Sequence, residues 1–317
     1  MQRTRLERLR RHLGFLLGVV LVGLLAAGCG NAAAASPSGP IRIVDDLGQT
    51  ITLSHPADRL VVLEPSNFEI VDALGLRKDI VGIDSSIPTY TPAPWRAATR
   101  GLPSIGPSYP GITVERIVAA RPQVVLATTG ISGLKGLTAL HIPVVVLNPQ
   151  NIQGVYHDIA LVGAITGHRA AAAALVAHMR AQVQHWAAVA RRAPTHPTVF
   201  YDLGGLFTAG PHNFVNSLIQ LAGGVNIGAR LSSQAFPQVT AEQVVAANPD
   251  IILIDPDATT VAKERQIPGF LDTRAGKSGH IEAVFNSAYI NEPSPGLVLG
   301  LKELIELLHP GLITTGR

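Results

Sequence analysis

Short apolar runs alternate with amphipathic segments along most of the chain. RLVVLEP (59–65), DIVGID (79–84), VVLAT (124–128) and IPVVVL (142–147) are short apolar runs bounded by turn signals, so each predicts a buried strand. The segments between them predict helices, for example over 66–76 and 133–141, and residues 85–110 predict a loop. IRIVDD and QTITL, before all of these, predict a hairpin. Buried strands alternating with helices indicate a parallel sheet with helices on its faces.

The pattern changes between residues 152 and 192. This stretch has no proline and is rich in alanine, so it predicts helix almost throughout, with Gly163 and Gly167 as the two candidate breaks. Strand and helix signals resume after Pro194. The predicted fold class is α/β, with two similar Rossmann-like lobes whose parallel-rich sheets are joined by a single long helix. The predicted boundaries are an N-terminal lobe over 41–152, the connecting helix over 153–193 and a C-terminal lobe over 194–317.

One sequence motif occurs twice in the chain. VERIVAARPQVVLA (114–127) returns as AEQVVAANPDIILI (241–254), with six of fourteen positions identical. In each copy a threonine, Thr113 or Thr240, is placed to cap a helix. Glu115 or Glu242 follows in the first turn, where a carboxylate suits the positive end of the helix dipole. Each glutamate alone predicts nothing beyond a stabilised helix. As a pair at equivalent places of two lobes, they also suit a partner with two cationic sockets.

The first residues differ from the rest. MQRTRLERLRRH precedes fifteen residues without a charge and then Gly28-Cys29, which predicts a secretory signal peptide over 1–28. The apolar run is short for a membrane span, which needs about 20 residues. Cys29 is the only cysteine, so it has no internal disulfide partner. Residues 29–40 then predict a flexible tether behind that cysteine.

Composition narrows the class of protein. The 317 residues are 47% hydrophobic and 15% charged, which suits a globular body with a large core. Residues 1–28 carry five arginines and one glutamate, so without them the net charge changes from +3 to −1. The basic balance thus gives no support for a nucleic-acid partner.

No catalytic motif stands out. G-x-S-x-G and H-E-x-x-H are absent, and GISGLKG has the spacing G-x-x-G-x-x-G rather than the dinucleotide fingerprint. No group of histidines and acids has the spacing of a metal site. The sequence therefore predicts a protein that is not an enzyme, with no cofactor and no resident metal.

Ligands of α/β lobes collect at the loops beyond the carboxyl ends of the strands. The aromatic side chains in these loops would suit a large, partly apolar chelate or macrocycle, and the His212 imidazole is a candidate axial ligand to a metal that such a compound carries. The predicted ligand-binding residues are Asn67, Tyr90, Trp95, Tyr109, Phe207, His212, Tyr289 and Glu292.

Two resemblances make the prediction specific. LLAAGC (24–29) resembles the lipobox of bacterial lipoproteins, which implies that Cys29 carries lipid. Residues 41–310 resemble substrate-binding proteins of the ABC importers for iron-siderophores, haem and vitamin B12. Stretches that carry the second resemblance are RLVVLEPSNFEIVDALG (59–75), TVERIVAARPQVVLA (113–127) and SPGLVLGLKEL (294–304). It implies a ligand cleft between two lobes, with Glu115 and Glu242 docking onto arginines of the permease.

One segment departs from that family. Relatives often read Arg-x-Ser-Pro-Arg near the end, whereas residues 292–296 here are Glu-Pro-Ser-Pro-Gly. The resemblance therefore does not imply a preference for an anionic ligand, and it leaves the ligand open.

The sequence as a whole predicts an extracytoplasmic, lipid-anchored monomer on the cell membrane. It captures a ferric siderophore, cobalamin or haem-type ligand and delivers it to an ABC transporter permease dimer. The alternatives are a ligand-binding sensor without a transporter and a secreted α/β enzyme.

Overall fold

The structure is a computed structural model that describes residues 39–313. The described residues from 40 onward form one compact unit. The predicted signal peptide and Cys29 lie outside the described residues. Within the described part of the chain, no helix combines the length and apolarity needed to cross a membrane.

The first sheet of the compact unit is entirely parallel. Its strands are β3 (Leu60–Val62), β4 (Ile80–Ile83), β5 (Val124–Ala127) and β6 (Val144–Val146), in the order β4-β3-β5-β6. Every residue of β3, β5 and β6 is buried, as apolar runs between two helical layers should be. The predicted hairpin is present as β1 (Ile41–Val44) and β2 (Thr50–Leu53), paired antiparallel.

The second sheet repeats the first. It contains β7 (Thr198–Asp202), β8 (Val225–Asn226), β9 (Ile251–Ile254) and β10 (Ile281–Ala283), in the order β10-β9-β7-β8 and all parallel. In each sheet the second strand in chain order lies at one edge, followed by the first, third and fourth, so the two lobes have the same topology. This confirms the predicted fold class of two similar α/β lobes.

Helices surround both sheets. Part of the predicted loop over 85–110 in fact forms short helical turns, α3, α4 and η2, which the Pro- and Ser-rich sequence concealed. The helices are α2 (Pro65–Ala73), η1 (Arg77–Asp79), α3 (Ile87–Tyr90), α4 (Ala93–Arg96), η2 (Ala97–Thr99), α5 (Val114–Ala119), α6 (Leu134–Ala139), α7 (Ile152–Ile165), α8 (Arg169–Ala190), α9 (Phe214–Leu221), α10 (Gly228–Leu231), α11 (Ala241–Ala247), α12 (Val261–Glu264), η3 (Phe270–Asp272), α13 (Arg274–Ser278), α14 (Ser287–Asn291) and α15 (Leu297–Leu308).

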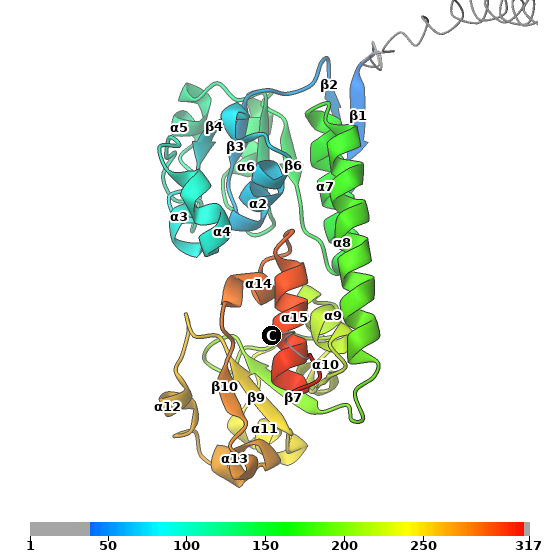
Figure 1. Ribbon diagram of the computed structural model, residues 1–317. Helices are drawn as coiled ribbons and strands as arrows, with labels where there is room; N and C mark the ends of the chain where they lie inside the picture. Colours follow the sequence, from blue (N-terminus) through cyan, green and yellow to red (C-terminus); the bar gives the residue numbers. More distant parts are fainter. Residues whose placement is uncertain (1–38, 314–317) are drawn as a thin grey trace, which may run out of the picture. The chain divides into compact units, whose positions relative to one another are not determined.

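The connecting segment is divided into two helices. α8, with 22 residues, is the long helix between the lobes, and it packs against α15 of the C-terminal lobe (Figure 1). α7 lies antiparallel to α8, so that Tyr156 meets Arg180 at 4.6 Å from ring centroid to guanidinium carbon. The break falls at Gly167, whose φ of 76° favours glycine. Gly163, the other candidate break, lies inside α7 instead.

Gly163 is the point of closest approach between α7 and α8. A Cβ at this position would overlap the Cβ of Ala172. Gly163→Ala is therefore expected to lower the free energy of unfolding by about 1–3 kcal/mol, measured by chemical denaturation. Adding Ala172→Gly removes the overlapping methyl and should restore stability to within about 1 kcal/mol of wild type. Equal stability of wild type and Gly163→Ala would contradict this packing.

The repeated sequence motif folds in a similar way in both lobes. α5 and α11 each begin one residue after the threonine. In both copies the residue before the proline has a positive φ, 48° at Arg121 and 47° at Asn248, and the helix has ended by that residue. Thr240 forms the expected cap and completes a capping box with Gln243. The prediction of a Thr113 cap was wrong, because its side chain makes no such bond.

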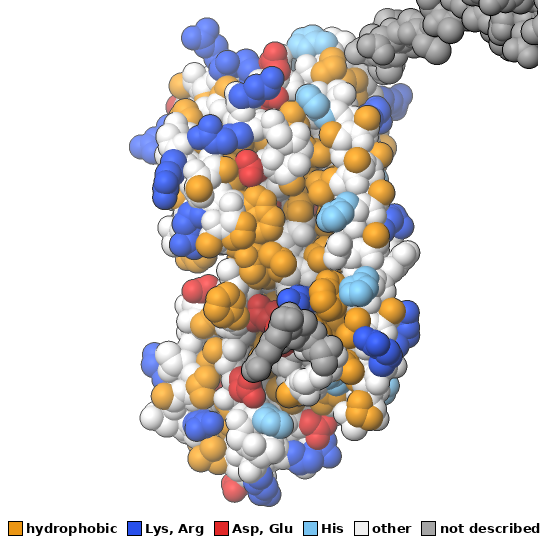
Figure 2. Space-filling view, in the orientation of Figure 1, with side chains coloured by type: hydrophobic (Ala, Val, Ile, Leu, Met, Phe, Trp, Pro, Cys, Tyr) orange, Lys and Arg blue, Asp and Glu red, His pale blue; other side chains and the backbone are white. Residues whose placement is uncertain are grey.

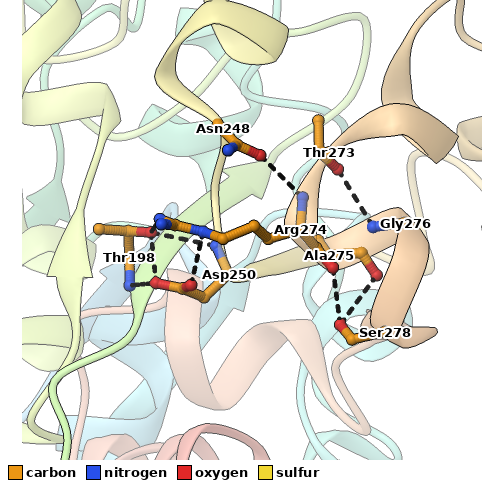
Figure 3. A network of polar contacts seen from close by, with 8 residues as sticks. All are labelled: Thr198, Asn248, Asp250, Thr273, Arg274, Ala275, Gly276 and Ser278. Atoms are coloured by element: carbon orange, nitrogen blue, oxygen red, sulfur yellow. Dashed lines mark hydrogen bonds and ion pairs between the residues drawn. The ribbon is translucent and has the colours of Figure 1, made fainter.

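The residue after the proline in each copy of the motif hydrogen-bonds to the backbone at the start of a strand, β3 in the N-terminal lobe and β7 in the C-terminal lobe. In the N-terminal lobe, Gln123 Oε1 accepts from the backbone N–H groups of Asp58 and Arg59, at 2.7 and 3.1 Å. In the C-terminal lobe, Asp250 accepts from the backbone N–H of Thr198 at 2.8 Å and pairs with Arg274 at 2.8 Å (Figure 3). The polar residue after the proline is therefore repeated because it fixes the start of a strand in each lobe, which is a structural role.

Candidate functional site

A cavity of about 460 Å³ lies between the two lobes. Five of the residues in its walls lie one or two positions after the end of a strand. They are Glu64 after β3, Thr128 after β5, Leu147 after β6, Leu203 after β7 and Asp255 after β9. The carboxyl ends of both parallel sheets thus border one cavity, the place where α/β folds collect ligands. In the space-filling view, apolar side chains gather in the band between the lobes (Figure 2).

The remaining walls mix aromatic and neutral polar side chains. Asn213 is held in place by two bonds, since its Oδ1 accepts from the Val215 N–H at 2.8 Å and its Nδ2 donates to the Ala235 carbonyl at 3.1 Å. Tyr109 donates to the Thr129 carbonyl at 3.2 Å. The other lining residues are Ser66, Asn148, Pro149, Gln150, Phe214, Phe236, Asn291, Glu292 and Pro293.

Three carboxyl groups face the cavity. Burial, followed by the negative charges of Glu292 and Asp84, raises the pKa of Glu64 to about 8. Burial raises the pKa of Glu292 to about 7, opposed by the hydrogen bond from the Ser66 backbone. Burial also raises the pKa of Asp255, whose Oδ2 accepts from Asn291 at 2.8 Å. Among the described residues that line the cavity there is no Lys, Arg or His.

The lobes touch each other beside the cavity. Ser294 Oγ donates to Glu69 Oε2 at 2.5 Å, joining α2 of the N-terminal lobe to the segment before α15. Burial raises the pKa of Glu69 to about 8, so at neutral pH this carboxyl is mostly protonated. Trp95 meets Tyr289 edge to face across the same boundary, with ring centroids 6.3 Å apart. These contacts join the two lobes beside the cavity.

Two of the eight predicted ligand-binding residues, Tyr109 and Glu292, line the cavity. Trp95 and Tyr289 lie beside it and contact each other. Asn67 is 2% exposed and donates to the Ala127 carbonyl at 3.2 Å, so it ties α2 to β5.

The remaining three predicted residues are outside the cavity lining. Tyr90 and Phe207 are 55% and 45% exposed on the surface, and His212 is also exposed. His212 is next in sequence to Asn213, which lines the cavity, but is not itself part of the lining.

Several lining residues had not been singled out. Glu64 and Asp255 carry a usable signal, because each lies within two residues of the end of a buried strand. Phe236, Asn148 and Gln150 come from loops whose path over the cavity is set by tertiary packing.

The predicted docking residues occupy equivalent and accessible positions. Glu115 and Glu242 are each the second residue of their helix, α5 and α11, and both are exposed. The pKa of Glu242 is lowered because its carboxylate accepts from its own backbone N–H and from Thr240. Neither glutamate lines the cavity, so a role in docking would leave the ligand contacts undisturbed.

Two α/β lobes of one topology, with a long helix between them and a cavity where they meet, define a two-lobe solute-binding protein. A family model for periplasmic binding proteins matches residues 60–283, and the chain belongs to that family. This confirms the resemblance found in the sequence.

Three known proteins illustrate the relationship. The chain is 32% identical to a cobalamin-binding protein of Halobacterium salinarum, over 94% of this chain and 85% of that protein. It is 25% identical to YvrC of Bacillus subtilis, an uncharacterized ABC transporter substrate-binding lipoprotein, over 95% of this chain and 98% of that protein. The periplasmic haem-binding protein RhuT of Roseiflexus sp. RS-1 superposes with a TM-score of 0.68 at 27% identity, covering 79% of this chain and 99% of that one. Such relatives are solute-binding proteins rather than enzymes, and their family acts outside the cytoplasm.

Proposed function

We propose that this protein captures a corrinoid of the vitamin B12 type in the cavity between its lobes and delivers it to an ABC transporter permease. The observation that carries the proposal is a cavity bordered by both sheets, lined by neutral amides and carboxyl groups and by no described cation. A corrin macrocycle carries many neutral amide side chains. The similarity to a cobalamin-binding protein over 94% of the chain supports the same choice.

The lining suits such a ligand in two ways. Tyr109, Phe214 and Phe236 offer aromatic surface to the flat, partly apolar macrocycle. Side-chain amides on both lobes, such as Asn148 and Asn291, can each donate to and accept from an amide of the ligand. No bond is made or broken in this function.

Haem is the second candidate, and one observation favours it. Tyr109 lines the cavity, and tyrosine oxygen is a known axial ligand of haem iron. Haem, however, carries two carboxylates, and the cavity supplies carboxyl groups where cationic partners would be needed. A ferric siderophore of low charge is the third candidate. A sensor with the same ligand but without a transporter differs only in its partner.

Delivery and location complete the proposal. Glu115 and Glu242 would present one carboxylate per lobe to arginines of the permease dimer. Cys29 would carry lipid, so that the monomer stays on the outer face of the cell membrane, tethered by residues 29–40. The likeness to YvrC, named as a substrate-binding lipoprotein, supports this location.

Filling the cavity tests the ligand site. Leu203 is half-buried in the cavity wall, so Leu203→Trp is expected to occupy ligand space and weaken cobalamin binding by about 10- to 100-fold in calorimetry. Leu299→Trp is the matched control, because Leu299 is 43% exposed on α15 and lies outside the cavity lining. Equal affinities of the two variants would show that the ligand binds elsewhere.

A further inference from the structure

The carboxyl groups of the cavity come from opposite lobes. Glu64 follows β3 in the N-terminal lobe, and Glu292 follows α14 in the C-terminal lobe. They are close enough that the charge of Glu292 contributes to the raised pKa of Glu64. Glu64 Oε1 is buried and has no hydrogen-bond partner among the described residues. A buried polar atom that borders a ligand cavity without a partner is best satisfied by the ligand itself.

The groups around this pair are acidic or neutral. Glu64 is faced by Glu292 and Asp84 and by the Tyr109 hydroxyl. Glu292 accepts from the Ser66 backbone N–H, and its charge also raises the pKa values of Glu69 and Tyr109. Among residues 39–313, no Lys, Arg or His lines the cavity beside these two glutamates or contributes to the pKa of either one.

An amide and a carboxylate on the ligand meet this pair differently. An amide has both a donor and an acceptor, so it can bond a glutamate whether that glutamate is protonated or ionised. A carboxylate only accepts, so it can bond a protonated glutamate and is repelled by an ionised one. With pKa values of about 8 and about 7, both glutamates are mostly neutral at pH 6 and mostly ionised at pH 9.

We propose that Glu64 and Glu292 are specificity-determining residues that select ligands with an amide periphery and reject ligands that present a carboxylate to this wall. The inference rests on the proposed corrinoid function and adds to it a discrimination that strengthens with pH. It assigns a role to Glu64, and it gives a reason for an acidic residue at position 292.

The test compares cyanocobalamin with its monocarboxylic acids, in which one side-chain amide has been hydrolysed. Dissociation constants are measured calorimetrically on the full-length protein in detergent, at pH 6 and pH 9. For wild type, at least one monocarboxylic acid should bind about tenfold or more weaker than cyanocobalamin at pH 9, and nearly as well at pH 6. In Glu64→Gln with Glu292→Gln, that ratio should be small and independent of pH.

Glu264→Gln is the matched control. Glu264 is 1% exposed, and burial raises its pKa to about 8, but it lies outside the cavity lining. This variant should keep the pH-dependent ratio of wild type. A wild-type ratio near one at pH 9 for every monocarboxylic acid, or an unchanged ratio in the double variant, would overturn the inference while cobalamin binding stands. Absence of cobalamin binding at both pH values would instead overturn the proposed function, and the inference with it.

Discussion

Protein carrying Glu115→Lys together with Glu242→Lys is expected to bind its ligand with wild-type affinity and to support no uptake. Both glutamates are exposed at the second position of their helices, one on each lobe, and neither lines the cavity. Reversing both charges replaces two attractions to permease arginines with two repulsions, and like charges at an interface oppose docking by several kcal/mol. The measurements are calorimetric binding by the purified protein and ligand uptake by cells.

A matched control separates docking from net charge. Asp58 and Asp272 are also exposed acids, one on each lobe, and Asp58→Lys with Asp272→Lys changes the net charge by the same amount. Cells with this control should take up ligand at the wild-type rate. Wild-type uptake by the Glu115 and Glu242 variant would remove the docking assignment and leave the two glutamates as helix-stabilising residues.

Asp158→Asn is expected to stabilise the protein by about 2 kcal/mol or more at pH 8 and to have little effect at pH 4. Asp158 lies on α7, is 1% exposed, and neither of its oxygens has a donor among the described residues. Burial, together with the Asp46 carboxylate beside it, raises its pKa to about 9. Asparagine keeps the shape and can donate to Asp46 without needing a proton.

The direction in which the stability difference between Asp158→Asn and wild type changes with pH follows from proton linkage. Between about pH 4 and pH 9 the folded protein retains a proton on Asp158 that the unfolded chain releases, so this group lowers stability as pH rises. The asparagine variant lacks that titration, and its advantage should grow across the same range. Urea denaturation at pH 4, 6 and 8 measures it, with the exposed Asp58→Asn as control. A stability difference independent of pH would contradict a protonated Asp158.

The architecture could be predicted because it is encoded locally and twice. The sequence motif around Glu115 and its copy around Glu242 each specify a helix start, a helix end before proline and a buried strand. In both lobes the helix and the strand begin at matching positions of the motif. Gly163 and Gly167 were harder to distinguish, since glycine serves both close packing and positive φ. Only the tertiary contact with Ala172 decides between them.

The cavity could be predicted only in part. Position in a loop just after a strand was the right criterion for a cavity-lining residue, and Glu64 and Asp255 both meet it. Residue type was the weaker guide, because Trp95 and Tyr289 pair with each other while Phe207 is exposed at the surface. Which side chain of a loop faces a ligand depends on how the two lobes meet, and no local pattern carries that information.

The central claim is that the cavity between the lobes receives a corrinoid. The measurement that tests it most directly is a calorimetric titration of the purified protein with cyanocobalamin, haem and a panel of ferric siderophores under identical conditions. We expect one cyanocobalamin to bind per chain at micromolar affinity or tighter, with weaker or undetectable binding of haem and the ferric siderophores. Tight binding of haem or of a ferric siderophore, with no response to cyanocobalamin, would contradict it.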